Sequence, residues 1–181
     1  MVKLVILDRD GVINEDSDAF IKSPAEWEPI PGALEAIARL NRAGYKVVVA
    51  SNQSGVGRGL FDVQTLAAIH QRLRSELLSM GGHIDAIFYC PHHPEEGCRC
   101  RKPAPGLFEE IRERFNTALE GVPAVGDSLR DLEAARAAGA MPILVRTGKG
   151  EATLAKGQVP ADVPVYENLE AVVKALLANP A

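Results

Sequence analysis

The chain has 181 residues, of which 46% are hydrophobic and 24% charged, with 24 Asp and Glu against 20 Lys and Arg. This composition is typical of a folded globular protein and excludes a disordered tail, and the length predicts a single domain over residues 1–181. The formal charge of −4 argues against a nucleic-acid-binding protein, because no excess of cations is available to neutralise a phosphate backbone.

The apolar runs of the sequence are short, and those at residues 4–7 and 47–50 fall far below the length that spans a bilayer. The N-terminal segment reaches Asp8 too early to contain the apolar core of a secretory signal. We therefore expect a cytoplasmic protein without membrane contact, acting as a monomer. Cys90, Cys98 and Cys100 agree with this, because an odd number of cysteines in one loop is more typical of a metal site than of disulfides.

Short β-branched runs alternate along the chain with longer segments of helical periodicity. The expected strands cover residues 3–7, 46–50, 86–89, 124–125, 142–145 and, with a weaker pattern, 163–166. Strands that are apolar throughout and separated by helices predict a parallel sheet covered on both faces. The predicted fold class is therefore α/β, a Rossmann-like three-layer arrangement with no insertion large enough to form a cap domain.

Three of the intervening segments show an apolar helical face. These faces are formed by Leu34, Ile37 and Leu40, by Leu66, Ile69, Leu73, Leu77 and Met80, and by Leu107, Ile111, Phe115 and Leu119. Glycines at Gly44, Gly81-Gly82 and Gly139 stand where helices should end. Residues 148–157 and 179–181 resemble linkers.

Polar side chains follow four of these strands, at the edge of a parallel sheet where ligands bind. The first strand ends in Asp8-Arg9-Asp10-Gly11. Two carboxylates next to a buried strand repel each other and lose hydration, so they persist where a cation compensates or catalysis needs them. A solvated Asp-Gly turn is the alternative interpretation.

The other three strand ends carry complementary groups. Residues 51–59 offer a hydroxyl, amides and flexible glycines that can surround an oxyanion. Arg101 and Lys102 precede a helix, and Asp127 and Asp131, four residues apart, suit a cation and a water or lysine. Alone, these segments are a Gly-rich loop, a solvated cation pair and a capped helix start. Together with the first strand end they predict a phosphoryl-transfer site that holds a hard cation.

A cysteine-rich loop, residues 90–100, offers three thiolates and two imidazoles, and buried reduced cysteines are the alternative interpretation. Three Cys and one His complete a tetrahedral zinc shell, so the zinc would be structural. Fixing this loop would place Arg101 and Lys102 over the phosphate site. Elsewhere, His70 and His83 have no partner evident in the pattern and are expected to be structural or solvent-facing, and Phe20 and Trp27 to pack locally.

The four strand-end segments resemble, in order and spacing, the motifs of the haloacid-dehalogenase-like phosphatases. The matching residues are Asp8-x-Asp10-Gly11, Ser51, Lys102, and Gly126-Asp127 with Asp131. The resemblance covers residue 4 to about residue 147 and is highly specific. Residues 8–14, 51–55 and the cysteine loop running into Cys100-Arg101-Lys102-Pro103 are similar to a narrower group, which contains D-glycero-D-manno-heptose 1,7-bisphosphate 7-phosphatases and histidinol-phosphate phosphatases.

The resemblance implies a role for each matching residue. Asp8 would attack phosphorus and form an aspartyl phosphate, while Asp10 would act as acid and then as base. Mg²⁺ would be held by Asp8, the backbone carbonyl of Asp10, and Asp127, while Ser51 and Lys102 would stabilise the phosphoryl oxygens. The implied substrate-binding residues are Asp16, Asn52, Gln53, Ser54 and Arg101. The implied ligands of the structural Zn²⁺ are Cys90, His92, Cys98 and Cys100, with His92 rather than His93.

The sequence leaves the substrate open within this group. Arg58 in its Gly-Arg-Gly turn favours a heptose bisphosphate that loses its C7 phosphate, a step in the synthesis of nucleotide-activated heptose for lipopolysaccharide. The short stretch between His92 and Cys98 is more similar to the histidinol-phosphate branch. Many heptose-branch members carry Lys where this chain has Ser128, and the anomer cannot be read from the chain. A phospho-accepting signalling receiver is a distant alternative, since that module is shorter and lacks a cysteine loop.

Overall fold

The computed structural model describes residues 2–179. In this part of the chain six strands form one sheet in the order β3-β2-β1-β4-β5-β6, and every neighbouring pair is parallel. The strands are β1 (Leu4–Leu7), β2 (Lys46–Asn52), β3 (Ala86–Cys90), β4 (Pro123–Gly126), β5 (Met141–Val145) and β6 (Val165–Tyr166). The chain builds outward from β1 on one side and from β4 on the other. The order therefore reverses between these two strands, where parallel sheets open a ligand crevice.

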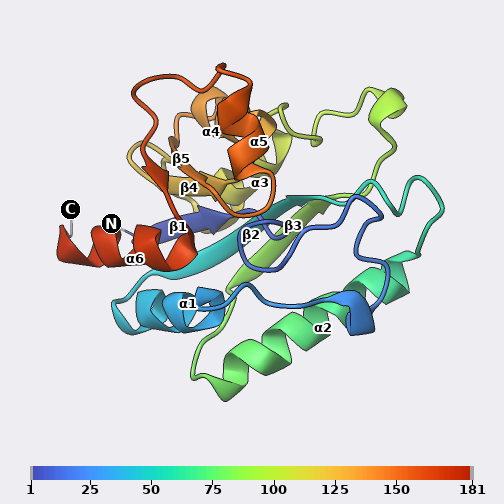
Figure 1. Ribbon diagram of the computed structural model, residues 1–181, viewed down its shortest axis with the longest axis horizontal. Coiled ribbons are helices and arrows are strands. Elements are labelled where there is room, and N and C mark those ends of the chain that lie inside the picture. The colour runs from blue at the N-terminus through green and yellow to red at the C-terminus, as the bar shows by residue number, and fades with distance from the viewer. Residues whose placement is uncertain (1, 180–181) are drawn as a thin grey trace.

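Helices cover both faces of the sheet, as Figure 1 shows. One layer contains α1 (Ala33–Arg42), α2 (Val63–Ser79) and α6 (Leu169–Ala178), and the other contains α3 (Gly106–Phe115), α4 (Leu129–Ala137) and α5 (Gly150–Ala155). Two short 3₁₀ turns, η1 (Pro24–Glu26) and η2 (Pro94–Glu96), lie in the connections. The predicted α/β fold with three layers is confirmed, and no large cap domain is present among the described residues.

The alternation of side chains along β1 explains why both faces are covered. Val5 and Leu7 pack into the core beneath α1, α2 and α6, whereas Leu4 and Ile6 pack into the core beneath α3 and α4. All four side chains are almost completely buried. Because each buried aliphatic side chain contributes about 1.5–3 kcal/mol, β1 is held firmly at the centre of the sheet.

Several predicted boundaries differ from the structure. Met80 caps the end of α2 and is exposed, and α3 ends at Phe115 because Asn116 adopts a left-handed conformation (φ 46°). Leu119 therefore lies beyond the helix, although its side chain still fills the core. Residues 148–157 contain α5 rather than a linker, and β2 extends to Asn52, which places Ser51 within the sheet.

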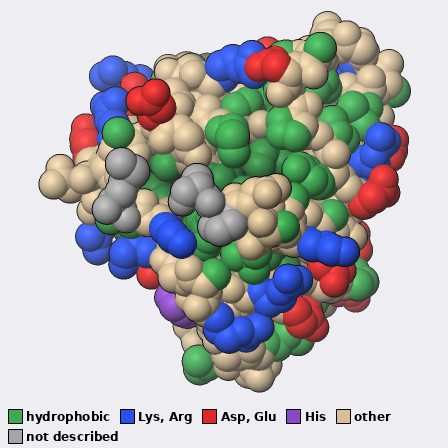
Figure 2. All heavy atoms as spheres, turned by 90° about the vertical axis from the view of Figure 1, so that its left-hand side faces the viewer, with side chains coloured by type: hydrophobic (Ala, Val, Ile, Leu, Met, Phe, Trp, Pro, Cys, Tyr) green, Lys and Arg blue, Asp and Glu red, His purple; other side chains and the backbone are tan. Residues whose placement is uncertain are grey.

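The two ends of the strands differ in chemistry. The ends where the strands begin face the viewer in Figure 2, where an apolar centre is surrounded by scattered charges of both signs. The polar groups predicted to be functional lie at the opposite, carboxyl ends of β1, β2 and β4. Among residues 2–179, no helix combines the length and apolarity needed to cross a membrane.

Candidate active site

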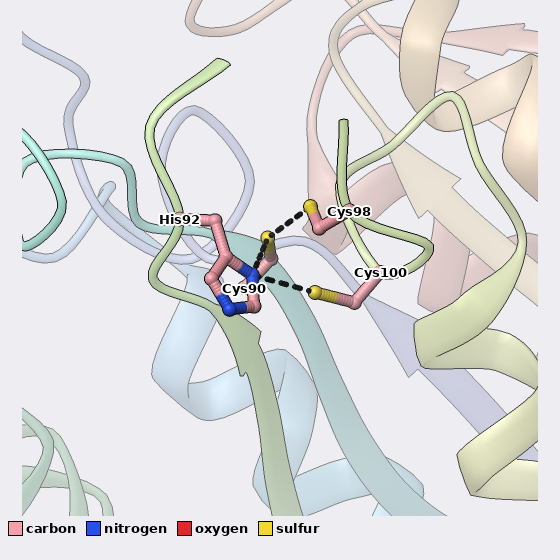
Figure 3. A group of neighbouring side chains, drawn as sticks. All are labelled: Cys90, His92, Cys98 and Cys100. Atoms are coloured by element: carbon pink, nitrogen blue, oxygen red, sulfur yellow. Dashed lines mark hydrogen bonds between the residues drawn. The ribbon is translucent and has the colours of Figure 1, made fainter. Parts of the chain in front are cut away.

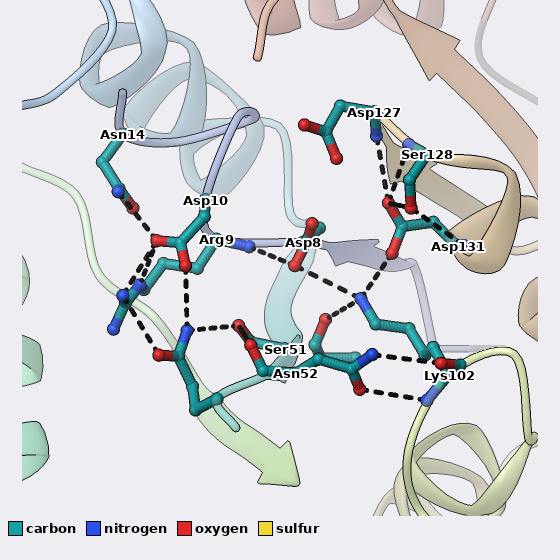
Figure 4. A network of polar contacts seen from close by, with 12 residues as sticks. Asp8, Arg9, Asp10, Asn14, Ser51, Asn52, Lys102, Asp127, Ser128 and Asp131 are labelled. Atoms are coloured by element: carbon teal, nitrogen blue, oxygen red, sulfur yellow. Dashed lines mark hydrogen bonds and ion pairs between the residues drawn. The ribbon is translucent and has the colours of Figure 1, made fainter. Parts of the chain in front are cut away.

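Lys102 joins two carboxylates at the centre of the site. Its Nζ lies 2.7 Å from Asp131 Oδ1 and 3.2 Å from Asp8 Oδ1, and it donates a hydrogen bond to the carbonyl oxygen of Ala50 (2.8 Å). The three hydrogens of the ammonium group therefore each have a partner. Asp8 is positioned directly after β1, where its backbone N–H donates to Val125 of β4 (2.9 Å). Figure 4 shows Asp8 facing Lys102 and Asp131 on one side.

Burial and the neighbouring charges both shift the pKa values in this cluster. Burial would lower the pKa of Lys102, but Asp131 and Asp8 outweigh it and raise the pKa well above its ordinary value. Burial raises the pKa of Asp8 to about 7, assisted by the negative charge of Asp131 and opposed by Lys102. Lys102 therefore stays charged and faces any anion that binds beside Asp8.

Asp131 holds a lysine, one of the two roles that the sequence left open. Burial would raise its pKa, but the Lys102 ammonium and the hydrogen bonds from Ser128 hold the pKa below its ordinary value. Its second oxygen, Oδ2, accepts from the backbone N–H of Asp127 and of Ser128 (both 3.1 Å) and from Ser128 Oγ (3.0 Å). Both oxygens are thus engaged, and Ser128 serves as the N-cap of α4.

Asp127 lies close to Asp8 at the end of β4. Its Oδ2 accepts from the backbone N–H of Lys149 (2.8 Å), and a Cβ added to Gly11 (φ 84°) would come within 2.0 Å of this oxygen. Only glycine therefore allows the chain after Asp10 to approach so closely. Burial, with the charges of Asp8 and Asp131, raises the pKa of Asp127 to about 9.

The carboxylates fit a hard divalent cation. One oxygen each from Asp8, Asp127 and Asp131 lies within 4.8 Å of the others, and the mutual repulsion of Asp8 and Asp127 is what such a cation offsets. Oxygen donors of this kind suit Mg²⁺. Because both oxygens of Asp131 are occupied, Asp8 and Asp127 are the side chains left to bind it.

Asp10 is held by a second network on the other side of Asp8 (Figure 4). Its Oδ1 accepts from Arg9 Nε (2.9 Å) and Asn14 Nδ2 (2.9 Å) and lies 2.8 Å from Arg9 Nη2. Its Oδ2 accepts from Gln53 Nε2 (3.1 Å). Burial would raise the pKa of Asp10, but Arg9, Asn14 and Gln53 together hold it below its ordinary value.

Ser51 and Asn52 at the end of β2, and Gln53 directly after it, bind neighbouring residues of the site. Gln53 is buried and donates to Ser51 Oγ (2.8 Å) as well as to Asp10, so among the described residues it lies behind the cavity wall rather than on it. Ser51 is also buried and is absent from that wall. Asn52 clamps Lys102 by accepting from its N–H (3.0 Å) and donating to its carbonyl oxygen (3.1 Å). Two predicted substrate contacts, Gln53 and Asn52, thus position Asp10 and Lys102.

A polar cavity of about 250 Å³ opens in front of these networks. Its lining includes the predicted residues Asp8, Asp10, Asp16, Asn52, Ser54, Arg101, Lys102 and Asp127. A larger hollow of about 810 Å³ adjoins it, and the two share the lining residues Asp16, Ser17, Asp18, Ser128, Arg130 and Lys149. Asp16 reaches Lys149 Nζ (3.6 Å) across the rim.

Three arginines face this cavity from different segments: Arg58 after β2, Arg101 from the cysteine loop and Arg130 from the first turn of α4. Burial lowers the pKa of Arg101, as do the nearby charges of Arg130 and Arg58. None of the three has a carboxylate within 4.0 Å among residues 2–179. Sequence reasoning missed Arg130, although a cation in the first turn of a helix opposes the helix dipole and is a usable signal.

The cysteine loop gathers four ligand atoms at the end of β3 (Figure 3). Cys90 Sγ lies 3.5 Å from Cys98 Sγ and 3.4 Å from His92 Nδ1, which lies 3.2 Å from Cys100 Sγ. Ligand atoms about 2.0–2.3 Å from a zinc ion, at tetrahedral angles, lie roughly 3.3–3.8 Å apart, so the group fits Zn²⁺. His93 is turned away, and its Nδ1 accepts from the N–H of Glu95 to cap η2.

This loop contacts the neighbouring segments closely. The N–H of Gly57 donates to the carbonyl oxygen of Pro91 (2.8 Å), and a Cβ on Gly57 would lie 2.4 Å from the backbone nitrogen of His93. The cysteine loop therefore positions Arg58 as well as Arg101. Elsewhere, His83 is exposed to solvent, as expected, and its Nε2 lies 3.4 Å from Asp85 Oδ1.

Comparison with known families agrees with this geometry. A family model described as polynucleotide kinase 3 phosphatase matches residues 3–131, and one described as "HAD-hyrolase-like" matches residues 99–172. The D-glycero-beta-D-manno-heptose-1,7-bisphosphate 7-phosphatase of Bordetella bronchiseptica is 58% identical, over 97% of this chain and 98% of the relative. The enzyme of the same name from Pseudomonas putida is 55% identical, over 97% of this chain and all of the relative.

Solved structures extend the likeness to three dimensions. The crystal structure of D,D-heptose 1,7-bisphosphate phosphatase from B. bronchiseptica, complexed with magnesium and phosphate, matches with a TM-score of 0.96 over 98% of this chain and 99% of that one. The corresponding phosphatase from Burkholderia thailandensis matches with a TM-score of 0.79 at 48% identity, over 98% of this chain and 99% of that one. The resemblance inferred from the four motifs is confirmed.

Proposed function

Because the chain belongs to the heptose-1,7-bisphosphate phosphatase family of haloacid-dehalogenase-like hydrolases, we propose that it removes the C7 phosphate of D-glycero-beta-D-manno-heptose 1,7-bisphosphate. Its class is phosphoric monoester hydrolase. The observation that carries the substrate proposal is one cavity with cations at two places, each suited to an anion. Asp8 and Lys102 lie at its base, and three guanidinium groups without carboxylate partners among residues 2–179 lie around it.

The three arginines suit the phosphate that is not cleaved. Arg58 and Arg130 each repel Arg101 in the free protein, and a second phosphate bound among the three would relieve that repulsion. Histidinol phosphate carries one phosphate and cannot occupy both sites at once. The adjoining hollow of about 810 Å³, reached past Arg130, leaves further room for the sugar.

The proposed reaction uses the two networks in turn. An Asp8 oxygen forms a bond to phosphorus as the bond from phosphorus to the C7 oxygen breaks, and Asp10 gives its proton to that leaving oxygen. The approaching phosphate dianion favours the protonated form of Asp10, which the free protein disfavours. Asp10 then takes a proton from water, which attacks the aspartyl phosphate and releases phosphate and free Asp8. Lys102 offsets the charge on the transferred oxygens throughout.

Two metal ions belong to the proposal. Mg²⁺, held by Asp8, the backbone carbonyl of Asp10, and Asp127, would supply charge neutralisation at the phosphoryl group. Zn²⁺, bound by Cys90, His92, Cys98 and Cys100, would be structural, since four protein ligands leave no open position. The magnesium of the B. bronchiseptica complex and the donor sets described above support these assignments.

The remaining parts of the proposal concern the state of the protein. Residues 1–181 would act as one domain and as a monomer. Three thiols that bind a metal must remain reduced, which favours the cytoplasm. The small substrate is the partner, without nucleic acid or membrane.

A kinetic panel tests the substrate. Rates with Mg²⁺ are compared for the β and α anomers of the heptose 1,7-bisphosphate and for histidinol phosphate. We expect the highest kcat/KM for the β anomer, and about tenfold or more over histidinol phosphate, since one charge-assisted contact contributes about 1.5–3 kcal/mol. A higher kcat/KM for histidinol phosphate would overturn the substrate while leaving the phosphatase mechanism intact.

A further inference from the structure

Arg9 lies between Asp8 and Asp10 in the chain, and its side chain is completely buried. Besides its contacts to Asp10, its Nη2 donates to Gln53 Oε1 (3.4 Å). Gln53 in turn donates to Asp10, so Arg9, Asp10 and Gln53 form a closed ring. A buried guanidinium can remain in the interior only where partners accept its N–H groups.

His70 supplies a further acceptor, for the Nη1 group of Arg9, which has no partner within this ring. Its Nε2 lies 3.1 Å from Arg9 Nη1, and the two residues are 61 positions apart in the chain. His70 lies on the buried face of α2 with Leu66, Ile69 and Leu73, and it is 7% exposed. Because a guanidinium only donates, Nε2 must accept, so the ring is neutral and carries its proton on Nδ1. Burial, with the nearby charges of Arg9 and Arg74, lowers the pKa of His70 to about 3 in agreement with this.

The orientation of Arg9 decides which oxygen of Asp10 can react. Oδ1 receives two N–H groups of Arg9 and one of Asn14, whereas Oδ2 receives a single N–H from Gln53. Oδ2 therefore keeps the lone pair that can hold and exchange a proton. Rotation of the guanidinium would release Oδ1 and let the carboxylate turn.

We propose that His70 is a positioning residue, which fixes the Arg9 guanidinium from α2 so that Asp10 presents Oδ2 to the leaving oxygen. This inference rests on the proposed function, because it assigns His70 to the proton transfer of that reaction. A merely structural histidine would fill the core equally well without an acceptor nitrogen. The two roles predict different losses of activity on different substrates when the acceptor nitrogen is removed.

A matched pair of variants isolates the nitrogen. His70→Phe keeps a ring of similar shape without an acceptor, and His70→Gln keeps an acceptor without the ring. Leu73→Ala, on the same face of α2 and without a polar group, is the control for a loss of packing alone. Thermal unfolding identifies the folded variants, and His70→Leu replaces the Phe variant if that one does not fold.

The readout is the dependence of kcat/KM on the leaving group, because kcat/KM reports formation of the aspartyl phosphate and not its later hydrolysis, in which Asp10 acts on every substrate alike. Heptose 1,7-bisphosphate and histidinol phosphate lose a poor alkoxide, which needs protonation, whereas p-nitrophenyl phosphate loses a stable phenolate. We expect His70→Phe to lower kcat/KM about tenfold or more on the alkyl phosphates, since a general acid contributes about 10²–10⁴-fold. The loss of kcat/KM on p-nitrophenyl phosphate should be less than about threefold. His70→Gln should recover most of the loss, and Leu73→Ala should lower both activities equally.

Equal losses on both kinds of substrate, or a Gln variant as poor as the Phe variant, would overturn the role of His70. The proposed substrate fails separately, if the wild-type enzyme prefers histidinol phosphate. The comparison of leaving groups is then made on histidinol phosphate, which also loses an alkoxide.

Discussion

The buried His70 predicts a specific acid sensitivity. Its pKa of about 3 lies far below the ordinary value near 6.5, because burial and the charges of Arg9 and Arg74 outweigh the attraction of Asp10. Between these pH values the unfolded chain binds a proton at His70 that the folded chain does not. The contribution of His70 to the free energy of unfolding is therefore fully present above pH 6.5. It falls as the pH is lowered, by about 2 kcal/mol at pH 5. His70→Gln has no such group.

Urea unfolding of the wild type and of His70→Gln, at pH 7.5 and at pH 5, measures this loss of stability. Carboxylates and the other histidines titrate in both proteins, so they cancel in the difference between them. For an m-value of about 2 kcal/mol/M, the wild-type midpoint should fall about 1 M further than that of the variant. Equal falls in the two midpoints would refute the reasoning and show that His70 is not held neutral.

Three further predictions concern catalysis, specificity and metal. Asp8→Asn should abolish turnover of every substrate while circular dichroism stays unchanged, because an amide is a poor nucleophile; activity near the wild-type level would exclude Asp8 as the nucleophile. Arg58→Ala and Arg130→Ala should each raise KM for the heptose bisphosphate up to about tenfold and leave KM for histidinol phosphate unchanged. The increase is modest because both side chains are exposed, so each charge-assisted contact lies at the low end of its energy range. Equal increases on both substrates would exclude the second anion site. Elemental analysis should find one Zn²⁺ per chain after Mg²⁺ is dialysed away, and removing the zinc should lower both Tm and kcat; a zinc-free protein with freely alkylated Cys98 would contradict the site.

The central sheet could be predicted because its strands are short apolar runs between helical patterns. The ends of these strands also located Asp8, Lys102, Asp127 and Asp131, since parallel topology brings carboxyl ends together whatever lies between them. Helix α5 escaped prediction because it is six residues long and begins at a glycine in a segment typical of a linker.

Contacts between distant polar side chains could not be predicted in this way. Arg9 appears in the sequence as the middle of a charged turn, and His70 as one polar residue on an apolar helical face. Only the packing of α2 against the end of β1 brings them to 3.1 Å. The sequence pattern places Gln53 in a loop that resembles a ligand-binding one, and only the structure shows that its amide donates to Ser51 and Asp10.

Asp8 and Lys102 are proposed to act on the C7 phosphate of the sugar bisphosphate and not on the C1 phosphate. Phosphorus NMR of β-heptose 1,7-bisphosphate during turnover with Mg²⁺ tests this assignment most directly, because the two phosphates give separate signals. We expect the C7 signal to disappear, inorganic phosphate to grow by the same amount, and the C1 signal to persist. Loss of the C1 phosphate first would contradict this assignment. So would two intact phosphate signals from a preparation of this protein that does cleave histidinol phosphate.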